Sequence, residues 1–194
     1  MSKVEWKPGT MIYPLPAVMV SCGDNSENYN IITISWTGTV CTDPALCYIS
    51  VRKSRHSHAL IKNSGEFVIN LTTKALAKAT DWCGVKSGKD FNKFKEMNLT
   101  PEKATHVSAP MIAESPVNIE CKVISVTELG SHDMFLAEVL AVHADETFID
   151  KKTGAFRLVD TSLISYLHGH YYELGKSVGH FGFSVKKKQT RKRS

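Results

Sequence analysis

The stretch Tyr29–His58, YNIITISWTGTVCTDPALCYISVRKSRHSH, decides the fold of this chain. Residues 31–37 alternate in the manner of a β-strand, and their β-branched content agrees with that pattern. One face of this predicted strand carries Ile32, Ile34 and Trp36, and the other carries Thr33, Ser35 and Thr37. Thr-Asp-Pro at 42–44 breaks the pattern, because proline has no N–H for a strand ladder. A second strand is predicted over residues 46–51.

The second strand leads into an unusually basic segment, residues 52–58, which holds three fixed cations, two hydroxyls and two imidazoles. Ser57 is the predicted N-cap of a helix that ends at Ser64-Gly65. Free N–H groups at a helix start, beside arginine, favour binding of an oxyanion such as phosphate. A solvated basic turn is the alternative, because most runs of charge are exposed to water.

Strand patterns dominate the rest of the chain. Strands are predicted over residues 15–22, 66–71, 117–126, 134–144 and 156–159, with a turn at 130–133. A helix over 75–82, capped by Thr72-Thr73 and closed at Cys83-Gly84, and one helical turn at 91–94 interrupt them. This order predicts a small, mostly antiparallel β-barrel with helical insertions, formed by a single domain over residues 1–183.

Composition excludes several classes of protein. The 194 residues carry a formal charge of +5, but six positive charges lie in residues 186–194, so the remainder sits near −1. The basic segment 184–194 is therefore a predicted disordered tail, and no nucleic-acid partner is expected. No apolar stretch is long enough to span a membrane. Five cysteines without a C-x-x-C motif indicate reduced thiols and a cytoplasmic location.

Several segments, in order, resemble the flavin-reductase-like FMN-binding split barrels, and flavoredoxin and its relatives in particular. They are NIITISWTGTVCTDPALCYISVRKSRHSHALIKNSGEFVINL (30–71), DWCGVKSGKDFNKF (81–94), SPVNIECKVISVTELGSHDMFLAEV (115–139) and YYELGKSVGHFGFSV (171–185). The resemblance covers residues 10–183. It implies an antiparallel, Greek-key type split β-barrel, FMN as cofactor, and a homodimer with FMN near the subunit interface.

The resemblance also implies roles for individual residues. Those expected along the flavin ring are Asn30, Thr33, Ser35, Trp36 and Thr37. Those expected at the FMN phosphate are Ser50, Arg52, Lys53, Arg55 and Ser57, with Lys93 approaching from a neighbouring element or the partner subunit. The phosphate group coincides with the anion site that the residues alone suggest. By its phase with Ile32 and Ile34, Trp36 would instead be a core residue.

His132 is the candidate for the substrate side of the site. It follows Gly130-Ser131 in a predicted turn, where a histidine without any role is equally common. In flavin reductases of this type a histidine in the matching context lies by the nicotinamide, which favours His132 as the catalytic residue. Tyr166 and Tyr172 are weaker candidates. No metal is expected at His168, His170 and His180, because carboxylates or thiols at ligand spacing do not accompany them.

Three functions remain open at this point. The first is an enzyme in which NAD(P)H reduces FMN and electrons pass to an acceptor. NAD(P)H would bind transiently, because a G-x-G-x-x-G motif is lacking. The second is an electron-transfer protein that holds FMN and is reduced by a partner protein. The third is a flavin-binding module without catalysis. The acceptor, a small molecule or a protein, does not follow from the sequence.

Overall fold

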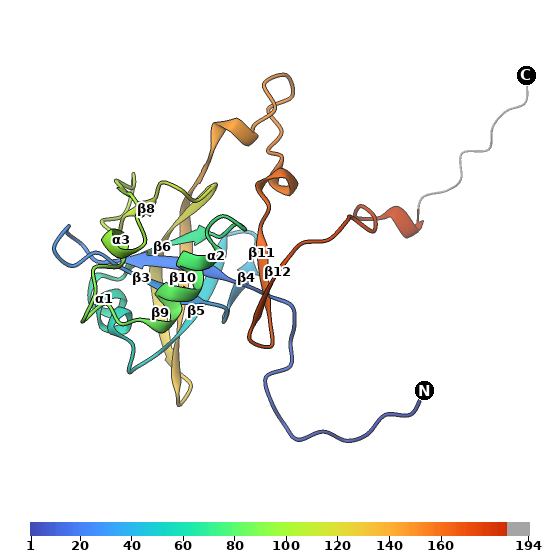
Figure 1. Ribbon diagram of the computed structural model, residues 1–194, viewed down its shortest axis with the longest axis horizontal. Helices are drawn as coiled ribbons and strands as arrows, with labels where there is room; N and C mark the ends of the chain where they lie inside the picture. Colours follow the sequence, from blue (N-terminus) through green and yellow to red (C-terminus); the bar gives the residue numbers. More distant parts are fainter. Residues whose placement is uncertain (186–194) are drawn as a thin grey trace, which may run out of the picture.

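The computed structural model describes residues 1–185, and its main feature is a curved antiparallel sheet (Figure 1). In this described part the sheet has seven strands in the order β3-β2-β6-β9-β10-β5-β4. Their bounds are β2 Val18–Cys22, β3 Asn30–Ile34, β4 Thr37–Cys41, β5 Leu46–Arg52, β6 Glu66–Leu71, β9 Val117–Glu128 and β10 His132–Ala144. The prediction of a mainly β, antiparallel fold is confirmed.

The two edges of this sheet are neighbours in the sequence. β3 forms one edge and β4 the other, and only Ser35 and Trp36 lie between them. A link of two residues spans no more than about 10 Å, so the sheet must curve until its edges meet. The backbone N–H of Ser50 on β5 donates to the carbonyl of Trp36 at 2.8 Å, which fixes the meeting point. The result is a barrel with a seam between β3 and β4.

Helices cover the outside of this barrel, and apolar side chains fill its inside. The inner core includes Val20, Ile49, Phe67 and Phe135, none of which is exposed to solvent. The helices are α1 (His56–Ser64), α2 (Ala77–Val85) and α3 (Lys93–Glu96). α2 and α3 pack on the outer face of β3, where Ile31 and Cys83 are buried (Figure 1). Both faces of β3 are therefore covered.

A smaller sheet stands beside the seam. It consists of β1 (Leu15–Pro16), β11 (Ile164–Leu167) and β12 (His170–Glu173), in the order β1-β11-β12. Figure 1 shows the β11–β12 hairpin next to β4 and α2. Two further short strands, β7 (Pro101–Glu102) and β8 (Met111–Ile112), form a separate pair. The hairpin thus places residues 164–173 next to the seam, which residues 30–41 form.

The structure corrects several local predictions. The strand expected over 31–37 is broken at Ser35-Trp36, because the chain crosses there from one edge of the sheet to the other. Ser57 does not cap α1: Arg55 occupies the N-cap, and the Ser57 hydroxyl accepts a hydrogen bond from Asn30 instead. Thr72-Thr73 do not cap α2, whose N-cap is Leu76, because the Thr72 hydroxyl donates to the carbonyl of Ala17.

Another correction concerns residues 156–159. Only Phe156 is bridged, to Ile149, and a short 3-10 helix, Leu158–Thr161, follows. Two other 3-10 helices are Glu146–Phe148 and Phe183–Val185. The predicted turn at 130–133 is shorter than expected, because His132 and Asp133 already pair with β5. The end of α1 is confirmed, since Gly65 terminates the helix in the left-handed conformation with φ 70°.

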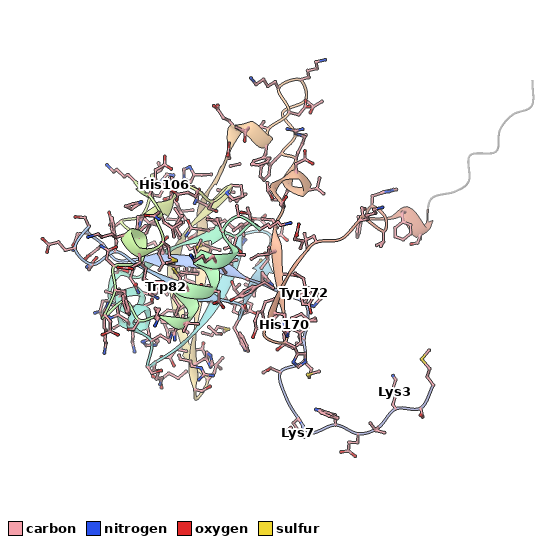
Figure 2. The ribbon with its side chains drawn as sticks, viewed as in Figure 1. Lys3, Lys7, Trp82, His106, His170 and Tyr172 are labelled. Atoms are coloured by element: carbon pink, nitrogen blue, oxygen red, sulfur yellow. The ribbon has the colours of Figure 1, made fainter. Side chains whose placement is uncertain are left out.

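The end segments leave the body of the molecule. Figures 1 and 2 show the N-terminal residues, with Lys3 and Lys7, and the segment after β12 running away from the barrel. Of the predicted tail 184–194, residues 186–194 lie outside the described residues. Within the described part of the chain, none of the helices has the length and apolar character needed to cross a membrane.

Glu120 on β9 is a buried carboxylate that organises the loop before β8. Its side chain is fully buried and accepts from the backbone N–H groups of Thr105, His106 and Val107 at 2.8, 2.6 and 3.1 Å. His143 on β10 contacts the same carboxylate. Burial acts to raise the pKa of Glu120, but these hydrogen bonds outweigh it, and the pKa is lowered from its usual 4.5.

We predict that Glu120→Gln lowers the free energy of unfolding at pH 7 by roughly 2–3 kcal/mol, because an amide cannot accept all of these hydrogen bonds. A carboxylate with a lowered pKa stabilises the fold above its unfolded pKa, and loses that effect as pH falls through the folded pKa. The difference between wild type and variant should therefore shrink below about pH 4.5. Urea unfolding at pH 7 and pH 3.5 measures it. Glu102→Gln, an exposed control, should behave as wild type; a similar loss there would contradict the assignment.

Candidate functional site

An open cleft of about 420 Å³ lies at the seam. Its floor and one wall come from the end of β3, the link and the end of β5, and the other wall comes from α2 and the β11–β12 hairpin. The lining residues are Ile32, Thr33, Ile34, Ser35, Trp36, Ser50, Val51, Arg52, Arg55, Asp81, Gly84, Val85, His132, Tyr166, Gly169 and Tyr171. The cleft therefore combines apolar and aromatic walls with two arginines.

Trp36 and His132 form the aromatic part of one wall. Their rings are stacked, with centroids 6.2 Å apart and an interplanar angle of 13°. Trp36 is in the link between the edges and keeps 38% of its surface exposed, so it is not a core residue. His132 opens β10 opposite Arg52 of β5. Partial burial, together with the positive charge of Arg52, lowers the pKa of His132, which favours a neutral imidazole near neutral pH.

The facing wall carries two tyrosines from the hairpin. Tyr166 on β11 and Tyr171 on β12 have ring centroids 5.8 Å apart. The Tyr171 hydroxyl donates to the Asp81 carboxylate of α2 at 3.4 Å, which ties the hairpin to the helix. Burial and the neighbouring Asp81 raise the pKa of Tyr171 to about 12. This tyrosine therefore stays a neutral hydrogen-bond donor on the cleft wall.

A smaller polar pocket of about 90 Å³ adjoins the cleft, and Ile32 and Arg55 line both. Its lining residues are Asn30, Ile32, Ser54, Arg55, His56, Ser57, Lys86, Ser87, Gly88 and Lys93. Asn30 donates from its amide nitrogen to the Ser57 hydroxyl at 2.8 Å, and Arg55 donates to the carbonyl of Gly84. Donors and positive charges predominate, which suits an anion.

Lys93 is the most unusual group in this pocket. Only 2% of it is exposed, and its ammonium donates to the carbonyls of Ile31 and Cys83, both at 2.7 Å. Burial lowers the pKa of Lys93 to about 8, and the charge of Arg55 contributes. Two of the three N–H bonds are used by these carbonyls, so one donor remains for another partner. The buried thiols around it have raised pKa values, about 12 for Cys22 and about 11 for Cys83.

The structure gathers most of the residues that the sequence predicted. The cleft holds Thr33, Ser35, Trp36, Ser50, Arg52, Arg55 and His132, and the polar pocket holds Asn30, Arg55, Ser57 and Lys93. Two predicted residues lie outside both. Thr37 is buried and donates from its hydroxyl to the carbonyl of Tyr48 at 2.6 Å. Lys53 follows β5 directly and pairs with Glu128 at the end of β9 at 2.7 Å and with Asp133 of β10 at 3.4 Å.

Sequence reasoning missed most of the second wall and part of the polar pocket. Asp81, Gly84 and Tyr171 were not predicted to line the cleft. Tyr166 does line it, whereas Tyr172 points elsewhere and lies beside His170, with ring centroids 6.4 Å apart (Figure 2). The basic Lys86-Ser87-Gly88 turn was a usable signal for the polar pocket, because glycine beside serine and lysine is typical of loops that bind phosphate.

Comparison with known proteins agrees with this geometry. The flavin reductase like domain model matches residues 10–175. An uncharacterised protein of Archaeoglobus fulgidus is 34% identical over 141 residues, which cover 73% of this chain and 78% of that protein. The structure of flavoredoxin from Desulfovibrio vulgaris (Miyazaki F) superposes with a TM-score of 0.86 at 29% identity, covering 96% of this chain and 100% of that one.

A more distant structure shares the fold alone. The FMN-binding protein of Thermus thermophilus, with bound 1-cyclohex-2-enone, has a TM-score of 0.77 at 22% identity, over 93% of this chain and 99% of that one. The expected split β-barrel is thereby confirmed. From the match over most of its length, the chain belongs to the flavin reductase like domain family.

Proposed function

We propose that this protein is a flavoprotein oxidoreductase that binds FMN, with the flavin ring in the cleft and the phosphate in the polar pocket. One observation carries the proposal: an aromatic-walled cleft opens, past Arg55, into a pocket that holds a buried lysine. A flat ring suits the aromatic cleft, and a phosphate joined to it suits the adjoining polar pocket.

The polar pocket fits a phosphate by the chemistry of its donors. Lys93 brings a positive charge that only two carbonyls accompany, and Arg55 and the Ser54 and Ser57 hydroxyls surround it. A buried ammonium is costly unless an anion accompanies it. A bound phosphate would supply that anion, which explains why the chain keeps a lysine in this position.

The cleft fits the ring. Trp36, Tyr166 and Tyr171 offer apolar surface, and Thr33, Ser35 and Ser50 place polar groups at its floor. FMN, when bound, would supply the ability to accept a hydride and to pass electrons on singly or in pairs. The residues of the chain orient the ring and limit the access of water. His132, neutral and at the rim, positions a nicotinamide that approaches the ring from solvent.

A second candidate function is an electron carrier reduced by a partner protein. The similarity to flavoredoxin at 29% identity favours it. We prefer the NAD(P)H-dependent reductase, because the stacked Trp36 and His132 leave an aromatic surface at the cleft mouth where a nicotinamide can lie. The final acceptor can be a small molecule or a protein in either case.

We also propose that the protein is a homodimer with the flavin near the interface. The β9–β10 hairpin exposes Ile124, Val126, Leu129 and Val142, and the segment after β12 exposes Val178 and Phe181. Exposed apolar groups on projecting segments are typical of surfaces that another chain covers. A second copy supplies the same segments in return, as twofold symmetry requires.

The reductase proposal predicts that the purified protein binds FMN and that NADH or NADPH bleaches its flavin absorbance without oxygen. His132→Ala should raise the KM for the pyridine nucleotide about tenfold while FMN affinity falls less than that, since we propose that His132 acts at the rim of the cleft, where the nicotinamide would approach. Tyr172→Ala, outside the cleft, is the matched control. Bleaching only by dithionite or a reduced partner protein would instead support the carrier, and failure to bind FMN would exclude both.

Lys93 predicts a pH dependence of FMN affinity. Its pKa of about 8 means that the amine is mostly charged at pH 7 and loses its proton as pH rises to 9. The affinity should fall roughly tenfold over that range, because one charge-assisted hydrogen bond is lost. Lys93→Met should bind FMN more weakly and without this slope, whereas Lys95→Met on the exposed side of α3 keeps it. A flat wild-type profile would contradict the assignment.

The dimer proposal is tested by light scattering. Wild type should have twice the mass of the chain, and Ile124→Asp with Val126→Asp should shift the protein towards monomer, because charged groups oppose burial of the hairpin. Val159→Asp, at a more exposed apolar position elsewhere, should leave the mass unchanged. A monomeric wild type at micromolar concentration would refute the dimer.

A further inference from the structure

Asp133 and His58 form a buried pair that has no part in the function proposed above. The carboxylate of Asp133 on β10 is fully buried, and His58 in the first turn of α1 is 8% exposed. His58 Nε2 lies 2.9 Å from Asp133 Oδ2. Neither residue lines the cleft or the polar pocket. The pair therefore lies behind the site and not in it.

The pair consists of an ionised carboxylate and an imidazole that donates to it. Burial acts to raise the pKa of Asp133, but the hydrogen bond from His58 and the charge of Lys53 outweigh it, and the pKa is lowered from its usual 3.8. An ionised carboxylate only accepts, so His58 Nε2 carries the hydrogen. Lys53 lies 3.4 Å from Asp133 Oδ1, an oxygen without a hydrogen-bond partner among the described residues. The contact with His58 is therefore the directional one.

Asp133 anchors the end of the hairpin that carries His132. Residues 124–131, the hairpin tip that projects from the barrel in Figure 1, are all exposed, and Asp133 is the first buried residue after them. Successive side chains on a strand point to opposite faces, so an inward Asp133 obliges His132 to face the cleft that it lines. The hydroxyl that contacts His132 Nδ1 at 2.9 Å belongs to Ser131, on the exposed tip. The buried anchor of this end is thus Asp133.

His58 anchors the start of α1, which borders the polar pocket. Arg55, the N-cap, makes no side-chain capping hydrogen bond, and the first turn contains no acidic residue. Two contacts with the barrel hold this turn instead: Ser57 accepts from Asn30 of β3 at 2.8 Å, and His58 donates to Asp133 of β10. The four residues before His58 all line the polar pocket. One side of the turn therefore meets the pocket, and the other side meets the buried pair.

Stability alone does not explain a charged pair in this place. The His58 ring meets Phe135 edge-on, with centroids 5.3 Å apart, and both Phe135 and Val51, which lies opposite Asp133, belong to the barrel core. Taking a carboxylate out of water is unfavourable, and well-packed apolar residues often replace a buried ion pair without loss of stability. A hydrogen-bonded pair differs from an apolar contact because it fixes a distance and a direction.

We propose that Asp133 and His58 are positioning residues whose contact sets the place of His132 relative to the polar pocket. The contact joins α1, which brings Arg55 and Ser57 to the pocket, to β10, which brings His132 to the cleft. The proposal rests on the proposed function, because the groups to be aligned are a nicotinamide at His132 and a phosphate in the pocket. It deepens that function by assigning two residues that line neither space.

The test replaces the pair by an apolar one. Asp133→Leu with His58→Leu should keep the midpoint of urea unfolding close to that of wild type, because the surroundings are apolar. The KM for NADH should rise about tenfold with kcat within about threefold, because His132 is no longer aligned. FMN affinity should fall about threefold, because α1 keeps only its contact with Asn30.

Two further variants serve as controls. Asp133→Asn still accepts from His58 through its amide oxygen, so it should recover most of the loss that the apolar pair causes. Glu138→Leu removes an exposed carboxylate from the same strand and should behave as wild type.

A second measurement needs no flavin. The rings of Trp36 and His132 are stacked, and Trp6→Phe with Trp82→Phe leaves Trp36 as the sole tryptophan. In this background the apolar pair should raise acrylamide quenching of Trp36 fluorescence about twofold, because the stack is lost. Asp133→Asn should leave the quenching as it is without the apolar pair.

The outcomes separate the fold, the positioning and the function. A stable apolar pair with unchanged KM and unchanged Trp36 quenching would overturn the proposal. Loss of stability in this pair and also in a smaller one, Asp133→Ala with His58→Leu, would overturn it too, because the contact would then serve the fold. A wild type that neither binds FMN nor oxidises NADH would refute the proposed function, and the quenching would still decide whether the pair positions His132. Higher KM and stronger quenching at unchanged stability are the supporting result.

Discussion

The two-residue link Ser35-Trp36 is the constraint on which the rest of the structure depends. It joins opposite edges of a seven-stranded sheet, so the sheet has to close, and the strands cannot pair continuously where it does. The seam that results is bordered by the two edge strands, β3 and β4, and by Trp36. α2 and the β11–β12 hairpin cover the seam only partly, and the space between them and the seam is the cleft. The site is thus a product of barrel closure.

Electrostatics at the seam complements this geometry. Burial of Lys93 places an ammonium where only carbonyls accompany it, and the lowered pKa reflects the cost. Nearby Cys22 and Cys83 do not offset that charge, because burial keeps both thiols protonated. A protein with such a pocket is less stable alone than with an anion bound, and ligand binding therefore adds to its folding free energy.

The alternation of apolar and polar residues along the sequence was enough to predict several strands of the main sheet. The alternation at 46–51, 66–71, 117–126 and 134–144 predicted four strands, and the basic segment after β5 lines the polar pocket with Ser54, Arg55, His56 and Ser57. Side-chain partners could not be predicted in the same way. Ser57 is a residue type that often caps helices, but here its hydroxyl accepts a hydrogen bond from Asn30. Lys53 forms ion pairs with Glu128 and Asp133 and does not line the polar pocket. The Tyr171–Asp81 wall joins residues 90 positions apart, which no periodicity reveals.

The distance along the chain between the two walls has a consequence for biosynthesis. During synthesis, β5 cannot pair with its barrel neighbour β10 until β10 has been made. The cleft wall that carries Tyr166 and Tyr171 cannot form until residues 164–173 have been made. A ribosome has to deliver nearly the whole domain before the barrel can close, since contacts of such long range form late. The cleft is therefore complete only after residues 164–173 have been synthesised, and a ligand that needs both of its walls can bind only after that point.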